Sequence, residues 1–214
     1  MLSTGVDVML SGGLRHWIPK STNEKGEVYE QLKSLTKGDI YLKSKRKDER
    51  NLLTEAQSAG YQLAFNRQML DKVEGDKLLG LFSYSGMDDG ITYSNKKNSI
   101  DRTQPSLKEM TAKALSILSK DKDGFFLMVE GGQIDWAGHS NDVGTMLHEM
   151  IKFDEAINTV YEWATGRDDT IIIVTADHET GSFGFSYSSQ DLPKPQKRPG
   201  EAFAEQDYAP NFNF

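Results

Sequence analysis

The sequence predicts an α/β fold, a mostly parallel sheet with flanking helices, from three features of its second half. Residues Phe125–Val129 form a continuous apolar run, which is typical of a buried strand. Apolar side chains then recur at helical spacing over Val143–Tyr161, and Gly166 ends that pattern. The run Thr170–Thr175 is β-branched at every position and indicates a strand that is buried on both faces. Strand, helix and strand in this order predict a βαβ unit with a right-handed crossover.

The first 85 residues contain three further strand candidates. Val6–Leu10 indicates a short strand that runs into a Ser-Gly-Gly turn. Leu78–Tyr84 is apolar and bounded by glycines, and Tyr61–Phe65 is a weaker strand candidate.

Two helices are predicted before the apolar run at Phe125–Val129. The first covers residues 48–59, has leucine and alanine on one face, and reaches Gly60 as its C-terminal cap. The second begins at Leu107, because Ser106 and Glu109 have the spacing of a capping box.

Two stretches of the chain indicate surface rather than core. The charge run over residues 43–50 mixes basic with acidic side chains, so we interpret it as a solvated loop rather than a basic binding patch. The tail from Ser186 to Phe214 holds four prolines and has no helical or strand period.

The composition excludes several classes of function. The 214 residues carry a net charge of -7 with a pI near 5.2, which argues against a nucleic-acid partner because phosphate contacts need a basic face. A small phosphorylated substrate is compatible with this charge, because metal ions can supply local positive charge. The chain has no cysteine, so disulfides and Cys-type zinc sites are excluded. No run approaches the roughly 18 apolar residues of a membrane span, and we expect no signal peptide at the N-terminus.

Five residues with metal-binding chemistry follow the two apolar runs. Glu130, Asp135 and His139 come after the first run, and Asp177 and His178 come after the second. Ligands of open α/β sheets bind beyond the carboxyl ends of the strands, so two neighbouring strands would deliver all five side chains to one edge.

The chemistry of these side chains favours a metal site over a loop that is merely polar. Imidazole and carboxylate are zinc ligands, and Glu130 is a hard oxygen donor that suits magnesium. Asp135 and His139 are four residues apart, so one helical turn or a tight loop can aim both at one ion. Adjacent residues on a strand face opposite ways, so Asp177 and His178 must lie on a turn to share an ion. Three glycines, Gly131, Gly132 and Gly138, would permit close backbone approach and positive φ.

The stretches VEGGQIDWAGH (Val129–His139) and VTADHETG (Val174–Gly181) resemble the two metal-ligand motifs of bacterial alkaline phosphatases. The resemblance points to the marine, cold-active branch, in which a tryptophan follows the first aspartate as Trp136 does here. It extends from about Gly124 to Tyr187 and is weaker at Val6–Gly13. It implies an alkaline phosphatase-like α/β fold that is incomplete in this chain. Residues 1–187 would form the partial domain, and residues 188–214 would begin a surface insertion.

The resemblance also assigns roles. It implies that Asp135 and His139 hold a first zinc ion, that Asp177 and His178 hold a second, and that Glu130 holds magnesium. Trp136 would border the substrate phosphate, against the alternative of an ordinary packed aromatic. The implied cofactors are two zinc ions and one magnesium ion.

The implied reaction is hydrolysis of small phosphate monoesters through a phosphoserine, in a periplasmic or secreted homodimer that neither crosses a membrane nor acts as a nucleic-acid regulator. The sequence has no Asp-Ser-Ala-like nucleophile element, and it lacks the family's bridging aspartate, phosphate-binding arginine and last zinc histidine. We therefore expect an internal fragment with no catalytic nucleophile and little activity of its own. The alternatives are a related phosphodiesterase, sulfatase or phosphoglycerate mutase, and a non-catalytic metal-binding fragment.

Four other polar residues are weaker candidates. We expect His148 on a helix surface, and Arg15 and His16 in ordinary loop packing after the glycine turn. Ser140 has no general base beside it in the sequence, so we do not expect a nucleophile there.

Overall fold

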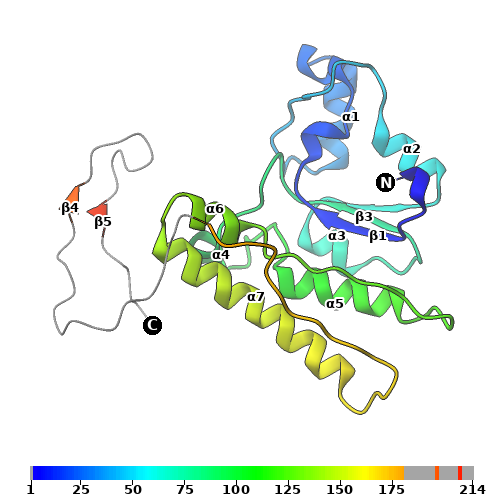
Figure 1. Ribbon diagram of the computed structural model, residues 1–214. Helices are drawn as coiled ribbons and strands as arrows, with labels where there is room; N and C mark the ends of the chain where they lie inside the picture. Colours follow the sequence, from blue (N-terminus) through cyan, green and yellow to red (C-terminus); the bar gives the residue numbers. More distant parts are fainter. Residues whose placement is uncertain (1, 181–195, 198–206, 209–214) are drawn as a thin grey trace.

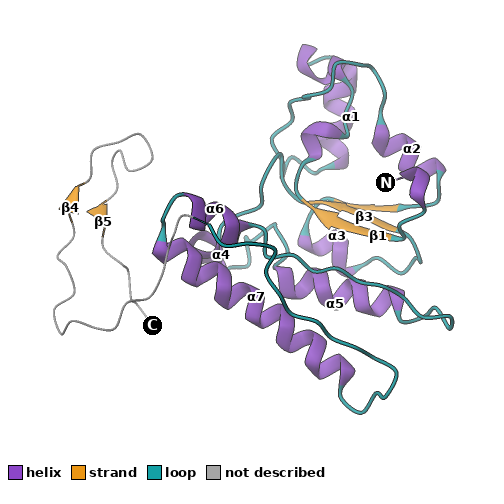
Figure 2. Ribbon diagram, viewed as in Figure 1, coloured by secondary structure: helices purple, strands orange, loops and turns teal. Residues whose placement is uncertain are grey.

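A three-stranded parallel sheet organises the first half of the protein in the computed structural model, which describes residues 2–180, 196–197 and 207–208. The strands are β1 (Val8–Ser11), β2 (Gln62–Ala64) and β3 (Leu78–Leu81), in the order β1-β3-β2. Val8 and Gln62 both pair with Leu78, so the three strands start level with one another. The prediction of a mostly parallel sheet with flanking helices is confirmed (Figure 2).

Helices cover both faces of this sheet (Figure 1). Side chains alternate along a strand, so Met9 enters the core on the side of α1 (Glu27–Leu35) and α2 (Leu52–Ser58), whereas Val8 and Leu10 pack toward α5 (Leu107–Leu118). All four residues of β3 are buried, as expected of the central strand. Each face of the sheet therefore contributes apolar side chains to its own buried cluster, and helices cover both clusters.

Local capping signals set the ends of several helices. The Asn51 side chain accepts hydrogen bonds from the N–H groups of Leu53 and Thr54, so α2 begins at Leu52, four residues later than predicted. Gly60 has φ 89°, the left-handed conformation that ends the helix as expected. The side chain of Ser106 and that of Glu109 make the predicted capping box at α5.

The other short elements of the first hundred residues connect the sheet to its helices. They are the 3-10 turns at Leu2–Thr4, Leu14–His16 and Lys20–Glu24, and the helices α3 (Arg67–Asp71) and α4 (Gly90–Lys96).

The charge run is tied into surface ion pairs. Arg46 pairs with Asp48 at 2.6 Å, and Arg50 pairs with Glu55 at 2.6 Å. Both pairs are solvent-exposed on at least one side, which agrees with a solvated loop and leaves no uniform basic patch there.

A long helix, α7 (Val143–Ala164), holds the second half together. It packs against α4, α5 and α6 (Gln133–His139), and Gly166 follows it with φ 81° (Figure 1). In the described part of the chain, no helix is both long and apolar enough to cross a membrane.

The predicted βαβ unit is wrong for this structure. Residues 125–130 and 170–176 belong to no helix or strand, so neither segment pairs in a sheet. Phe126 is 89% exposed and Ile171 is 88% exposed, so the expected burial is also absent. A strand exists only through hydrogen bonds to a neighbour, and here the two segments follow the helices instead: the ring of Phe125 packs edge-on against Trp163 of α7, with centroids 5.6 Å apart.

The described residues of the tail form one short strand pair. Strands β4 (Gln196–Lys197) and β5 (Asp207–Tyr208) are antiparallel, which corrects the expectation of no strand at these four residues. The remainder of the expected surface insertion over residues 188–214 lies outside the described residues.

Candidate metal centre

Helix α6 aims two of the predicted metal ligands in one direction. Asp135 and His139 lie one turn apart, and Oδ1 of Asp135 is 3.4 Å from Nε2 of His139. Both side chains reach solvent, with 38% and 66% of their side-chain surface exposed. The four-residue spacing therefore gives the shared direction that the sequence analysis expected.

The second pair of predicted ligands reaches the same place from another segment. The chain returns along α7 from its C-terminal end to α6 (Figure 1), and a bend at Asp177 turns it there. Nε2 of His178 lies 3.4 Å from Oδ2 of Asp177 and 3.9 Å from Oδ1 of Asp135. The N–H of His178 donates to Oδ1 of Asp177 at 3.1 Å, a local bond that holds the turn. Asp135, His139 and His178 thus converge, with Asp177 beside His178, although they come from segments more than 35 residues apart.

Glycine at position 138 allows this convergence. A Cβ at Gly138 would overlap the hydroxyl of Thr180, so the segment after His178 packs directly on the backbone of α6. Close approach also occurs at Gly131, where a Cβ would meet Ile134 at 2.9 Å. The expectation of positive φ is wrong at these positions: all glycines with positive φ among the described residues lie elsewhere, and Gly132 has φ -60°.

The donor set fits a divalent cation. Oδ1 of Asp135 is buried and accepts no hydrogen bond, a cost that a bound cation would remove. Two donors on one tetrahedral ion, with bonds of about 2.0 to 2.2 Å, lie roughly 3.4 Å apart. That edge length matches the contacts of Asp135 with His139 and of His178 with Asp177.

The four candidate ligands do not surround one common point in the structure. Among the described residues, no group of three or more His, Cys, Asp or Glu side chains is arranged to hold one ion. Both imidazoles face the same oxygen of Asp135, so the contacts are pairwise. Exposed side chains change rotamer on ps–ns timescales, so these imidazoles are free to reorient about Asp135.

Local interactions raise the pKa of one of the imidazoles. The backbone carbonyl of Glu179 accepts a hydrogen bond from the ring of His178, and together with the charge of Asp177 it raises the pKa of that imidazole. A metal ion binds neutral imidazole, so metal binding at His178 would compete with protonation of its ring.

Glu130 and Trp136 flank the convergent residues without joining them. The Glu130 carboxylate is exposed and lies beside Gly132, where a Cβ would stand 3.2 Å from Oε1. Trp136 is 57% exposed, and its ring covers Gly86, where a Cβ would stand 2.7 Å from the ring. Trp136 is therefore packed on one side and open on the other.

The weaker candidates have local partners. Nδ1 of His148 lies 2.9 Å from the hydroxyl of Ser94, between α7 and α4. Nε of Arg15 donates to His16 at 3.1 Å, and Ser140 donates to the carbonyl of Trp136 at 3.0 Å. These contacts agree with the packing that the sequence analysis expected.

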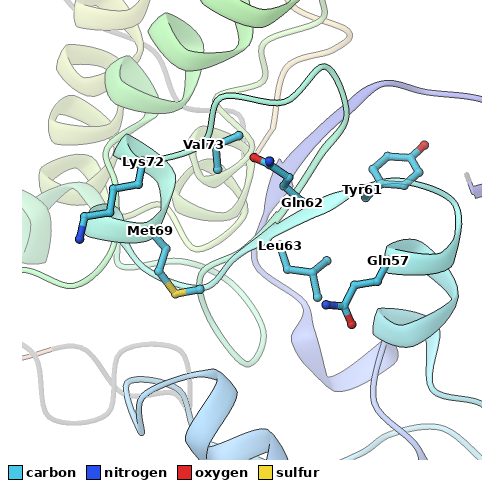
Figure 3. A pocket seen from close by; sticks show the side chains of 7 residues that line it. All are labelled: Gln57, Tyr61, Gln62, Leu63, Met69, Lys72 and Val73. Atoms are coloured by element: carbon cyan, nitrogen blue, oxygen red, sulfur yellow. The ribbon is translucent and has the colours of Figure 1, made fainter.

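A shallow open pocket of about 550 Å³ lies elsewhere, at β2 and α3 (Figure 3). Lys72 and Tyr61 are the titratable side chains among its lining residues, and no carboxylate or imidazole lines it. Its lining lacks the donors of a metal centre, so we place the functional site at α6 instead.

Sequence reasoning missed the residues that support α6. Gln133 donates hydrogen bonds to the carbonyls of Met87 and Asp88, at 2.7 and 3.2 Å. Lys152 of α7 donates to the same Asp88 carbonyl at 3.1 Å and pairs with the buried Glu149. The one signal in the sequence was the spacing of Glu149 and Lys152, three residues apart on a predicted helix that is rich in apolar residues.

The fold and the site together define an α/β protein with a candidate carboxylate–imidazole metal centre beside the loop that follows the central strand. The profile of the alkaline phosphatase family matches residues 1–208, and the chain belongs to that family.

Named relatives agree with this assignment. The chain is 44% identical over 140 residues to alkaline phosphatase 3 of Bacillus subtilis, an alignment that covers 64% of this chain and 28% of that protein. It is 37% identical over 190 residues to the repressible alkaline phosphatase of Saccharomyces cerevisiae, covering 82% of this chain and 30% of that protein. The chain thus spans about a third or less of the curated relatives it matches.

Solved structures of alkaline phosphatases also match. The alkaline phosphatase of a psychrophilic Shewanella superposes with a TM-score of 0.62 at 30% identity, over 84% of this chain and 35% of that one. The enzyme of the Antarctic bacterium TAB5 gives 0.60 at 26% identity, over 84% and 43% of the two chains. A mutant of the latter was solved with magnesium in its M3 site. The expected resemblance to the cold-active branch is confirmed at the level of family and fold.

Proposed function

We propose that this chain provides metal ligands for the hydrolysis of phosphate monoesters. The observation that carries the proposal is that the imidazoles of His139 and His178 both approach Oδ1 of Asp135, a buried oxygen that lacks a hydrogen bond, with Asp177 beside His178. Membership in the alkaline phosphatase family supports the choice of reaction.

In this proposal Asp135 and His139 hold a first zinc ion, Asp177 and His178 hold a second, and Glu130 holds magnesium. Bound there, paired divalent ions would stabilise the attacking and leaving oxygens of an in-line displacement. The exposed side of Trp136 borders the space that the substrate phosphate enters. The magnesium-bound TAB5 structure supports a metal of this kind in the family.

The attacking serine is not assigned within this sequence, because no Asp-Ser-Ala-like element occurs in it. We therefore expect the 214 residues to bind metal and to turn over phosphate monoesters little by themselves. This leaves a non-catalytic metal-binding chain as the second candidate. Action as a homodimer in the periplasm or outside the cell completes the proposal, on the family resemblance.

Zinc binding by the 214-residue chain tests the site directly. Competition with a chromogenic chelator gives the dissociation constant for Zn²⁺, and we expect His139→Gln to weaken it by at least tenfold. His148→Gln is the matched control, because His148 bonds Ser94 away from the site and its loss should leave zinc affinity unchanged. Equal zinc affinity in wild type and His139→Gln would refute the metal site.

Anion binding then tests the reaction class. The zinc-loaded chain should bind inorganic phosphate more tightly than sulfate in calorimetry, and His139→Gln should lose that binding. A preference for sulfate would favour a sulfatase instead. Turnover of a chromogenic phosphate monoester that Asp177→Ala abolishes would show that the nucleophile lies within these residues after all.

A further inference from the structure

We infer that Gln133 and the buried Glu149–Lys152 pair position helix α6, and with it Asp135 and His139, by holding the backbone of residues 86–88. This inference deepens the proposed function and rests on it. It assigns positioning roles to three side chains that contact no predicted metal ligand directly.

Helix α6 needs external support to hold its ligands in place. It has seven residues, and an isolated helix shorter than about 12 residues is marginal in water. Its N-cap, Gly132, offers no side-chain hydrogen bond, and Gly138 lies inside the helix. The orientation of Asp135 and His139 therefore depends on what the helix docks against.

The loop after β3 is the docking surface for the first turn. The side-chain amide of Gln133, the first residue of α6, donates to the carbonyls of Met87 and Asp88. One turn later the ring of Trp136 covers Gly86, where any side chain would collide with it. Gln133 and Trp136 together thus contact three successive residues of the loop, at positions 86–88.

The buried ion pair holds that loop from the other side. Glu149 and Lys152 keep 2% and 12% of their side-chain surface exposed, with Nζ of Lys152 3.0 Å from Oε2 of Glu149. Lys152 also donates to the Asp88 carbonyl, which therefore accepts from Gln133 and Lys152 together and has both lone pairs occupied. Gln104 fixes the rest of Asp88: its amide oxygen accepts from the Asp88 N–H, and its amide nitrogen donates to the Asp88 carboxylate.

A buried charge pair contributes little net stability, because both charges lose their hydration. The Glu149–Lys152 pair is therefore better explained by the groups that it holds in position. Here Lys152 places a charged donor on the carbonyl that also anchors the ligand helix. Metal affinity is sensitive to such support, because ligand distances must be met within about 0.2 Å. Loss of the supporting hydrogen bonds should therefore reduce zinc affinity about tenfold, the lower end of the range for outer-shell partners, because the contact is to the helix rather than to a ligand.

The experiment compares zinc affinity and thermal stability in the same variants of the 214-residue chain. Gln133→Leu replaces the amide with an apolar side chain that is one bond shorter, so both N–H donors are lost. Lys152→Met together with Glu149→Gln removes the charged donor without leaving Glu149 as an unpaired buried carboxylate. For both, we expect Zn²⁺ to bind about tenfold more weakly in chelator competition well below the melting temperature.

Three controls separate positioning from simple destabilisation. Gln31→Leu makes the same chemical change on the exposed face of α1, where Gln31 bonds only Glu27, and should leave zinc affinity unchanged. Ile18→Val removes one methyl from a fully buried side chain, so it should lower the melting temperature and leave zinc affinity unchanged. Asp135→Asn must weaken zinc binding for the site itself to stand.

Two results would overturn the inference. If Gln133→Leu lowers the melting temperature as Ile18→Val does and leaves zinc affinity at the wild-type value, Gln133 is structural and positions nothing. If Asp135→Asn binds Zn²⁺ as tightly as wild type, the proposed metal site fails and the inference falls with it. The inference is supported if Zn²⁺ binds more weakly to Gln133→Leu and to the double variant, while the zinc affinities of Gln31→Leu and Ile18→Val equal that of wild type.

Discussion

Replacement of Glu109 by glutamine should produce a stability loss that depends on pH. Burial alone raises the pKa of this carboxyl, but hydrogen bonds from Arg102, the Ser106 N–H and Arg67 outweigh it and lower the pKa from 4.5 to about 2. The guanidinium of Arg102 makes two of these bonds, at 2.9 and 3.0 Å, and it is 6% exposed. Glu109 therefore joins the start of α5 to a nearly buried cation.

The size of the effect follows from linkage. At roughly 1.4 kcal/mol per pKa unit, the lowered pKa of Glu109 corresponds to about 3 kcal/mol of folding free energy at neutral pH. The carboxyl is 29% exposed, so solvent screening makes this an upper bound. Because the folded-state pKa is depressed, this stability is complete above about pH 4.5 and is lost as the pH falls toward 2.

The assay is urea unfolding of wild type and Glu109→Gln between pH 7 and pH 3. We expect the variant to be less stable by up to about 3 kcal/mol at pH 7. The difference should shrink steadily below pH 4.5, because Glu109 of the unfolded wild-type chain takes up a proton there while the folded-state carboxylate stays ionised. Glu55→Gln is the matched control, because Glu55 also bonds an arginine but does so at the exposed surface. A difference between Glu109→Gln and wild type that stays constant from pH 7 to pH 3 would contradict the electrostatic reasoning.

Two glycine substitutions test other parts of the argument. Gly138→Ala should weaken Zn²⁺ binding, because its Cβ would displace Thr180 and the segment that carries His178. Gly144→Ala is the control and should leave Zn²⁺ affinity unchanged, because the nearest atoms to its Cβ position lie at 3.7 and 3.8 Å. Equal Zn²⁺ affinities of the two variants would show that the Gly138 contact is unimportant. Gly60→Ala should lower the free energy of unfolding by roughly 1 kcal/mol, because φ is +89° there and alanine is strained in that conformation. Gly26→Ala is the control and should cost less, because φ is -90° and the space around its Cβ position is open. Equal losses of stability in urea unfolding would argue against backbone strain at Gly60.

Signals that act within a few residues were readable from the sequence. The capping box of Ser106 and Glu109 and the left-handed Gly60 depend on neighbours in the chain, and both are present as predicted. The spacing of Asp135 and His139 required only one helical turn. These features need no knowledge of the rest of the fold, which is why pattern alone was sufficient.

The two apolar runs show where this reasoning stops. Residues 170–175 have the composition of a central strand, but strand propensity measures packing against neighbours, and the sheet of the described residues ends at β1 and β2. Ile173 is consequently 80% exposed rather than buried. Composition can indicate which segments are able to pair, but hydrogen bonds to a specific neighbour decide whether they do so.

The support of α6 was hidden for a related reason. The partners of Gln133 are backbone carbonyls about 45 residues earlier, and a backbone carbonyl has no signature in the sequence. The charged pair in α7 was visible as an anomaly, since Glu149 lies among Met146, Leu147 and Met150, but its target was not. A buried charge in an apolar helix therefore predicts that a polar partner exists, and the fold is needed to identify it. In this protein Glu149 pairs with Lys152, and Lys152 donates to the carbonyl of Asp88, the same group that anchors the helix carrying Asp135 and His139.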